Sequence, residues 1–279
     1  MSLNFTIPPI FAEAHRQAIY RYHSTPEGLP PRVWATLFEA MDLLRTAIVS
    51  RHSEEQRTFA SVYHSLVDLR YADSYIDALL DSENPSDISS PLWAAIARRI
   101  DRDVRTSGLF DPSAPDSRLL LSYLLYWWQQ FARGYAFEVE IFRDLVASHI
   151  QFQAHNLRVR AERLSAADLT VSSFRGDIKT SAYFLAQQRH PDPAIDFYVT
   201  RAWLPTGRAR VLVVFLKPNV WQDIDGETSQ TTLTTLEQVL PQPGSVQIGS
   251  QTVIVVDYEV WKEKMRAYQE EGRDVSDAS

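Results

Sequence analysis

The sequence contains no cysteine in 279 residues. This absence excludes disulfides, a thiolate nucleophile and any metal site built from thiolates. It suits the reducing cytosol, so we expect a cytoplasmic protein. The N-terminus lacks the basic start and apolar run of a signal peptide, and the longest apolar run, residues 119–128, is about half as long as a membrane span. We therefore expect no membrane partner.

Motifs of several large enzyme classes are also missing. The chain has no G-x-G-x-x-G, no P-loop and no G-x-S-x-G, which removes motif-based predictions of a dinucleotide enzyme, a P-loop NTPase or a serine hydrolase. The seven histidines show no H-x-H or H-E-x-x-H spacing, so each is interpreted as a surface or core residue. Asp223 to Glu227 resembles the start of a calcium loop, but Thr234 stands where that loop needs a glutamate. A polar turn leading into a helix is expected there instead.

The charge distribution along the chain is uneven. The net charge is −7, which argues against general polyanion binding by the whole protein. From Ile150 to Lys217, however, there are ten basic residues and five acidic ones, which leaves +5 in the middle and −12 elsewhere. A basic centre in an acidic protein is typical of a site for an anionic ligand. A chance excess on solvated strands is an equally good interpretation of this count alone.

The first part of the chain is predicted to be helical. Only one glycine precedes residue 108, and apolar residues recur at helical spacing. Ser53 with Gln56 forms a capping-box pattern, and Ser90 before Pro91 is a typical helix start. The expected helices span 11–22, 32–51, 54–82 and 91–106. A segment rich in turn-forming residues, 107–117, then predicts the end of this helical part.

The remainder of the chain alternates between helical and extended patterns. A long helix is expected at about 118–148, followed by β-branched and aromatic stretches separated by turns. The strands predicted from these stretches span 151–160, 168–173, 176–181, 195–204, 210–217 and 251–258. Further helices are expected at 180–189, 227–240 and 259–271. We thus predict an α/β (α+β) fold, a mixed sheet flanked by helices in residues 113–272, with an all-helical N-terminal domain, 1–112, and a disordered tail, 273–279.

Three charged residues fall inside predicted strands. If residues 168–177 form a symmetric hairpin turning between Ser172 and Ser173, Asp168 and Asp177 lie directly opposite each other. Facing like charges are unfavourable without a counter-charge. Lys179 supplies part of it, because a residue two positions after Asp177 projects from the same strand face. A divalent cation would supply the rest, and oxygen ligands of this kind suit Mg²⁺.

A third carboxylate is predicted to come from the long helix. Helical spacing places Glu138 among apolar residues of the inward face, whereas Glu140 falls on the polar side with Asp144. A buried glutamate is costly unless it meets a cation or a hydrogen-bond donor. Glu138 is therefore the candidate site residue on this helix.

Together these residues resemble the PD-(D/E)xK nuclease superfamily, the fold of many restriction endonucleases, over residues 118–217. The G-x-x-x-E pattern ending at Glu138 is similar to the first-helix motif of several branches. Asp168 matches the lone acid, and Asp177-Ile178-Lys179 matches the (D/E)xK triplet. The expected order of helix, three strands, helix and strand also agrees. Ala167 stands where the proline of the family name would be, a common variation.

The resemblance implies a restriction-endonuclease-like fold and a metal-dependent endonuclease that hydrolyses phosphodiester bonds, with DNA as the expected substrate. Asp168 and Asp177 would bind Mg²⁺ (or Mn²⁺), with Glu138 as a ligand or as a partner of a metal-bound water. Lys179 would orient that water and neutralise charge that develops in the transition state. Nearby basic residues would bind phosphates: Arg158, Arg160, Arg163 and Arg175.

Other interpretations stay open at this stage. Many relatives dimerise to cut both strands, so the resemblance also implies a homodimer. A chain that kept the fold and lost turnover would instead be a catalytically inactive scaffold for nucleic acid or protein partners. Taken alone, the hairpin is better interpreted as a solvated turn with Asp177 and Lys179 as an exposed pair. Convergence of the four predicted site residues in one cluster would separate these cases.

Overall fold

A computed structural model describes most of the chain. The described residues are 48–50, 56–107, 115–180, 192, 194–203, 209–225, 232–233, 244–248 and 251–277. The predicted helix at 11–22 and nearly all of the predicted helix at 180–189 lie outside them. Within the described residues, none of the helices has the length and apolar content needed to cross a bilayer.

The chain divides into two compact units, Met1–Ala136 and Phe137–Ser279. The division falls inside helix α6 (Pro115–Ala147), whereas the sequence pattern placed a domain boundary at residue 112, before this helix. Aromatic packing explains the difference. The ring of Trp127 meets Phe59 edge-on at 5.0 Å between centroids, and Trp128 meets Tyr75 in the same way at 5.3 Å. The first half of α6 therefore belongs to the helical unit.

Besides the first half of α6, the described helices of the first unit form one nearly continuous stretch and one separate helix. The elements are α3 (Phe59–Tyr63), the π-helical segment η1 (His64–Ala72), α4 (Asp73–Asp81) and α5 (Pro85–Thr106). The N-terminus of α3 is capped by Thr58, whose hydroxyl accepts a hydrogen bond from the Ser61 N–H at 3.2 Å. Helix α5 begins at Pro85 rather than near Pro91, because Pro85 already occupies a first-turn position, where the missing N–H costs nothing.

Two predicted helix ends in this unit are wrong. Residues Ile48–Ser50 form strand β1 and residues Gln56–Thr58 form strand β2, which pair antiparallel. The predicted helices 32–51 and 54–82 both overlap these strands, and Gln56 is not part of a capping box. Ile48, Val49 and Thr58 are β-branched, so pairing with a neighbouring strand outweighs the weak helical pattern here.

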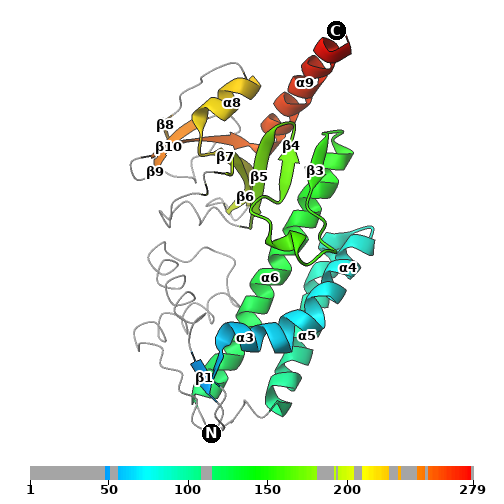
Figure 1. The fold of residues 1–279 in the computed structure, drawn as a ribbon, viewed down its shortest axis with the longest axis vertical. Helices are drawn as coiled ribbons and strands as arrows, with labels where there is room; N and C mark the ends of the chain where they lie inside the picture. The colour runs from blue at the N-terminus through cyan, green and yellow to red at the C-terminus, as the bar shows by residue number, and fades with distance from the viewer. Residues whose placement is uncertain are drawn as a thin grey trace. The chain divides into compact units, whose positions relative to one another are not determined.

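The second unit is built around one open mixed sheet (Figure 1). The described strands lie in the order β3-β4-β5-β6-β7-β10-β9-β8, and all neighbours are antiparallel except the parallel pairs β5–β6 and β8–β9. Their bounds are β3 Phe152–Ala154, β4 Leu169–Val171, β5 Phe174–Lys179, β6 Phe197–Trp203, β7 Ala209–Phe215, β8 Thr232–Leu233, β9 Gly244–Ile248 and β10 Gln251–Asp257. The predicted mixed α/β class is confirmed.

Most of the strands agree with the sequence pattern, and the exceptions have local causes. The predicted strand at 151–160 is extended only over β3 and then gives way to turns and the 3₁₀ helix η2 (Glu162–Leu164). Strand β8 lies inside the predicted helix 227–240, so that prediction is wrong at Thr232–Leu233, where parallel pairing with β9 takes precedence. Helix α8 (Pro218–Asp225) was not predicted, and it begins at a proline suited to a first turn.

A large cluster of buried residues lies on one face of the sheet and includes side chains of helices α6, α8 and α9. Helix α9 (Tyr258–Asp277) is longer than the predicted helix 259–271 and continues into the predicted tail. Its Trp261 ring lies 5.4 Å from Phe197 of β6, and Phe215 of β7 lies 5.3 Å from Trp221 of α8. The Lys262 ammonium donates to Asp144 at 2.7 Å, which joins α9 to α6. Full burial of each such aromatic side chain contributes roughly 1.5–3 kcal/mol, and together they fix α8 and α9 against the sheet.

Candidate metal centre

The β4–β5 hairpin has the register that the sequence predicted. Leu169 pairs with Gly176 and Val171 with Phe174, so the turn consists of Ser172 and Ser173. Ser172 adopts φ 55°, a left-handed conformation typical of a tight two-residue turn. The next positions in this register are Asp168 and Asp177. The two aspartates are therefore cross-strand neighbours, and this prediction is confirmed.

Asp168 is held by the backbone of β5. Its N–H donates to the Gly176 carbonyl at 3.0 Å, and its Oδ2 accepts the N–H of Ile178 at 2.7 Å. Ile178 lies between the two charged residues of the Asp-x-Lys triplet. A carboxylate that accepts a backbone N–H has a fixed orientation, so Asp168 is directed at the triplet without depending on a flexible side chain.

Asp177 and Lys179 form an ion pair on the same face of β5, with 2.5 Å between the ammonium nitrogen and the carboxylate. The Asp177 side chain is 11% exposed and that of Lys179 is 42% exposed, so the pair bridges the interior and the solvent. Burial, and to a lesser degree the neighbouring Asp168, raises the pKa of Asp177 to about 7 against the opposing charge of Lys179. At neutral pH this carboxyl group is therefore poised between its two protonation states.

Glu138 of α6 points inward and Glu140 points outward, as helical spacing predicted. Glu138 is buried, whereas Glu140 is exposed and accepts a hydrogen bond from Arg201 at 2.9 Å. Burial raises the pKa of Glu138, partly offset by contact with His155. The buried carboxylate thus meets a donor, which is the condition under which an inward glutamate is tolerated.

His155 is the residue that the sequence interpretation missed. Its Nε2 contacts Glu138 Oε1, and its Nδ1 lies 3.8 Å from Asp168 Oδ1. Its backbone N–H donates to the Asp168 carbonyl at 3.0 Å, and its side chain is only 6% exposed. Burial opposes the charged imidazolium, but the contacts with Glu138 and the charge of Asp168 outweigh it, so the pKa of His155 is raised.

The pairing of strands β3 and β4 indicates where His155 lies. Strand β3 pairs with β4 so that Ala154 lies opposite Leu169, and one further step places His155 opposite Asp168. The same register argument that paired the two aspartates would have found it. Treating every histidine as an ordinary surface or core residue overlooked the place of His155 in this cluster, because a motif search detects only residues that are close in sequence.

Glu138, His155 and Asp168 form a cluster suited to a metal ion. One ligand atom from each lies within 4.8 Å of the others, and Asp177 adjoins the cluster through its hydrogen bond with Asp168. The donors are carboxylate oxygens and imidazole nitrogen, which bind divalent cations. Two buried carboxylates and the mostly buried Asp168, near one ion-paired lysine and one histidine, are also costly to ionise together, so a divalent cation fits the electrostatics of the cluster.

The predicted phosphate-binding arginines lie along the chain next to this cluster. Arg158 and Arg175 are exposed, whereas Arg160 and Arg163 are half-buried. The first three belong to the segment that follows His155, where the Asn156 N–H donates to Glu162 at 2.8 Å. Arg175 lies two residues before Asp177 on β5, and its N–H donates to Asp196 at 2.8 Å. Exposed arginines in ordered segments are suitable for phosphate contacts.

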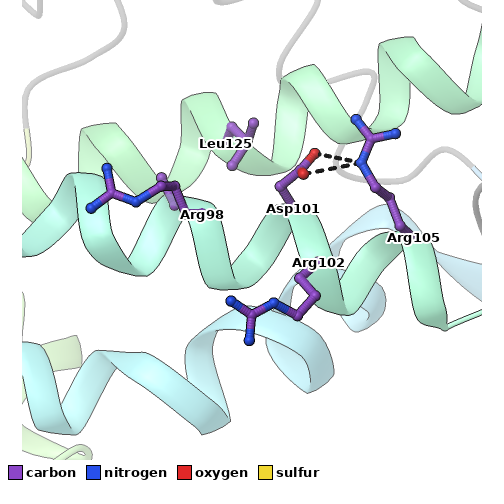
Figure 2. Close-up of a pocket in the computed structure, with 6 residues that line it drawn as sticks. Arg98, Asp101, Arg102, Arg105 and Leu125 are labelled. Carbon is purple, nitrogen blue, oxygen red and sulfur yellow. Dashed lines mark hydrogen bonds and ion pairs between the residues drawn. The ribbon is translucent and has the colours of Figure 1, made fainter.

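A second basic feature lies in the helical unit. A surface pocket is lined by Ala97, Arg98, Asp101, Arg102 and Arg105 of α5 and by Leu125 of α6. Figure 2 shows the three guanidinium groups at separate places along α5, with Arg105 paired to Asp101 through Nε at 3.0 Å. The one carboxylate of the pocket is thus already neutralised. The pocket offers positive charge for binding an anion, but it lacks the paired acids that hydrolytic chemistry requires.

The site residues are therefore brought together from helix α6, from the ends of β3 and β4, and from β5. No protein-family model, no curated protein and no solved structure matches this chain.

Proposed function

We propose that this protein is a metal-dependent nuclease of the PD-(D/E)xK type that hydrolyses phosphodiester bonds in DNA. One observation carries the proposal. Glu138, Asp168 and the Asp177–Lys179 triplet come from three separate elements, and they meet in one largely buried cluster. A solvated turn with an exposed ion pair would not bury carboxylates in this way.

The order of elements supports the proposal. Helix α6 is followed by the antiparallel strands β3, β4 and β5, and then by β6, which pairs parallel to β5. Parallel neighbours need a crossover connection, and the predicted helix 180–189 falls in that connection. This order agrees with the helix, three strands, helix and strand implied by the resemblance.

The chemistry divides between the cation and the protein. A divalent cation held by Asp168, Asp177 and the Glu138 side of the cluster would polarise the phosphodiester and lower the pKa of an attacking water. Lys179 is the partly exposed member of the cluster, so its ammonium can reach a substrate phosphate that approaches from solvent. There it stabilises negative charge that grows in the transition state. The hydrogen bond from Ile178 keeps Asp168 in place throughout.

A separate observation supports a second candidate function. Asp177 is ion-paired with Lys179, and Glu138 is in contact with His155, so the charges are partly neutralised within the protein itself. A chain that had lost turnover could keep such a cluster as a structural element. It would then be a catalytically inactive nuclease-fold protein that binds nucleic acid or protein partners.

A cleavage assay with a matched control separates the two. Plasmid and linear DNA, and RNA, are incubated with Mg²⁺ or Mn²⁺ and with wild type, Lys179→Ala or Lys217→Ala. Lys217 is a suitable control because it is also a half-exposed strand-end lysine in an ion pair, with Asp196 at 2.8 Å. We expect Lys179→Ala to lower the cleavage rate on the order of a hundredfold and Lys217→Ala to leave it nearly unchanged.

The outcomes are distinct. Wild type that cuts none of these substrates with either metal supports the scaffold. Cleavage that survives Lys179→Ala unchanged places the active site elsewhere. Selective loss with Lys179→Ala, and retention with Lys217→Ala, supports the nuclease.

A further inference from the structure

We infer that His155 is a metal ligand through Nδ1, that Glu138 orients its imidazole, and that the centre prefers a first-row transition-metal dication such as Co²⁺ to Mg²⁺. The inference rests on the proposed function, because it concerns the cation of the same site. It departs from the ligand set of the resemblance, in which every candidate ligand is a carboxylate.

The first argument is the environment of His155 Nδ1. This nitrogen is buried and has no hydrogen-bond partner among the residues that the structure describes. The whole side chain is 94% buried, since 6% of it is exposed. A buried polar atom without a partner is costly, and such atoms are rare unless an unseen water or ion meets them.

The second argument is the direction of the two ring nitrogens. Nε2 contacts Glu138, so a neutral imidazole places its proton there and leaves a lone pair on Nδ1. That lone pair lies 3.8 Å from Asp168 Oδ1, which also carries negative charge. In this neutral tautomer the two atoms repel unless a cation lies between them. A metal about 2.1 Å from each ligand atom can bridge a gap of this size.

The third argument is the role left to Glu138. Metal-binding histidines usually donate their other N–H to a carboxylate, which sets the tautomer and the orientation of the ring. In the same way, the carboxylate of Glu138 contacts the Nε2 atom of His155. The Oδ2 atom of Asp168 accepts the Ile178 N–H, whereas Oδ1 is the oxygen on the side of His155 Nδ1. His155 and Asp168 then supply the first ligands, with Asp177 adjoining them through Asp168, and Glu138 becomes a positioning residue.

The chemistry of the donors sets the preference. Mg²⁺ binds oxygen ligands and gains little from imidazole, whereas Co²⁺, Ni²⁺ and Zn²⁺ bind imidazole well. Replacing one carboxylate oxygen with a histidine nitrogen therefore favours the transition metals over Mg²⁺.

Titration calorimetry on the full chain, with Co²⁺ and Mg²⁺ as separate probes, tests the inference. In His155→Gln the amide can still donate to Glu138, but no atom replaces Nδ1. We expect this variant to lose Co²⁺ affinity by about tenfold or more and Mg²⁺ affinity by less than about threefold. His149→Asn is the control, because His149 is exposed and its φ of 58° is one that asparagine tolerates.

A second measurement needs no variant. Mn²⁺ bound to wild type should show nitrogen coupling in pulsed EPR, and its absence would overturn the assignment of His155 as a ligand. An unchanged ratio of Co²⁺ to Mg²⁺ affinity in folded His155→Gln would also overturn the assignment of His155 as a ligand. In that case the proposed nuclease function would still stand if wild type binds metal and cleaves its substrate. If wild type binds neither cation, the inference fails, and the cleavage assay alone decides the function.

Discussion

The Oδ2 atom of Asp168 accepts the backbone N–H of Ile178 at 2.7 Å, and Ile178 separates Asp177 from Lys179. One hydrogen bond thus joins the lone acid of β4 to the triplet of β5. It also leaves Oδ1 on the side of His155, 3.8 Å from Nδ1. Because a backbone donor cannot rotate away, the carboxylate is oriented before any cation or substrate binds.

The raised pKa of Asp177 predicts how stability depends on pH. Without metal, the folded state keeps a proton up to about pH 7, whereas the unfolded chain releases it near pH 4. Stability contributed by this group is therefore fully present below about pH 4 and is lost as pH rises to about 7. Urea unfolding in EDTA should show wild type losing stability relative to Asp177→Asn across this range. Parallel pH profiles of the two proteins would contradict the assignment.

Glu138 and Glu140 provide a matched pair on one helix. Glu138→Gln should impair both cation binding and cleavage, because it removes the negative charge that faces His155 and the cation. Glu140→Gln removes only an exposed ion pair with Arg201, which is worth less than about 1 kcal/mol. Cleavage rates and calorimetry measure both effects. Equal losses in the two variants would mean that the buried cluster is not where the chemistry occurs.

The exposed arginines near the cluster should contribute to substrate binding. Arg158→Gln with Arg175→Gln should weaken DNA binding and lower the slope of log affinity against log salt by about one for each lost phosphate contact. Arg98→Gln with Arg102→Gln, on the pocket of α5, is the comparison. Fluorescence anisotropy at several salt concentrations gives the slopes. A larger change from the α5 pair would assign the main DNA contact to the helical unit.

Gly176 should resist substitution because a side chain there has no space. A Cβ on Gly176 would lie 2.3 Å from the Phe197 ring, which is fully buried beside Trp261. Gly176→Ala should therefore destabilise the fold by roughly 1–3 kcal/mol. Gly134, in α6, has nothing within 4 Å of such a Cβ, so Gly134→Ala should stabilise by about 0.5–1 kcal/mol. Chemical denaturation measures both, and opposite signs are expected.

The local parts of the site follow from the sequence alone. The strand period of two places Asp177 and Lys179 on one face, and a two-residue turn at Ser172–Ser173 places Asp168 opposite Asp177. The helical period of 3.6 directs Glu138 inward and Glu140 outward. These relations depend only on residues close in the chain, whose geometry is set by covalent structure and backbone hydrogen bonds.

The position of His155 and the extent of the helical unit were decided by the tertiary structure. His155 meets Glu138 only because α6 packs on the sheet through side chains such as Phe137 and Ile141, and because β3 pairs with β4 at one particular register. Strand β1 forms where a weak helical pattern was read, since pairing with β2 outweighs it. Such contacts join segments far apart in sequence, and their free energy comes from burying surfaces that exist only once the elements have packed together.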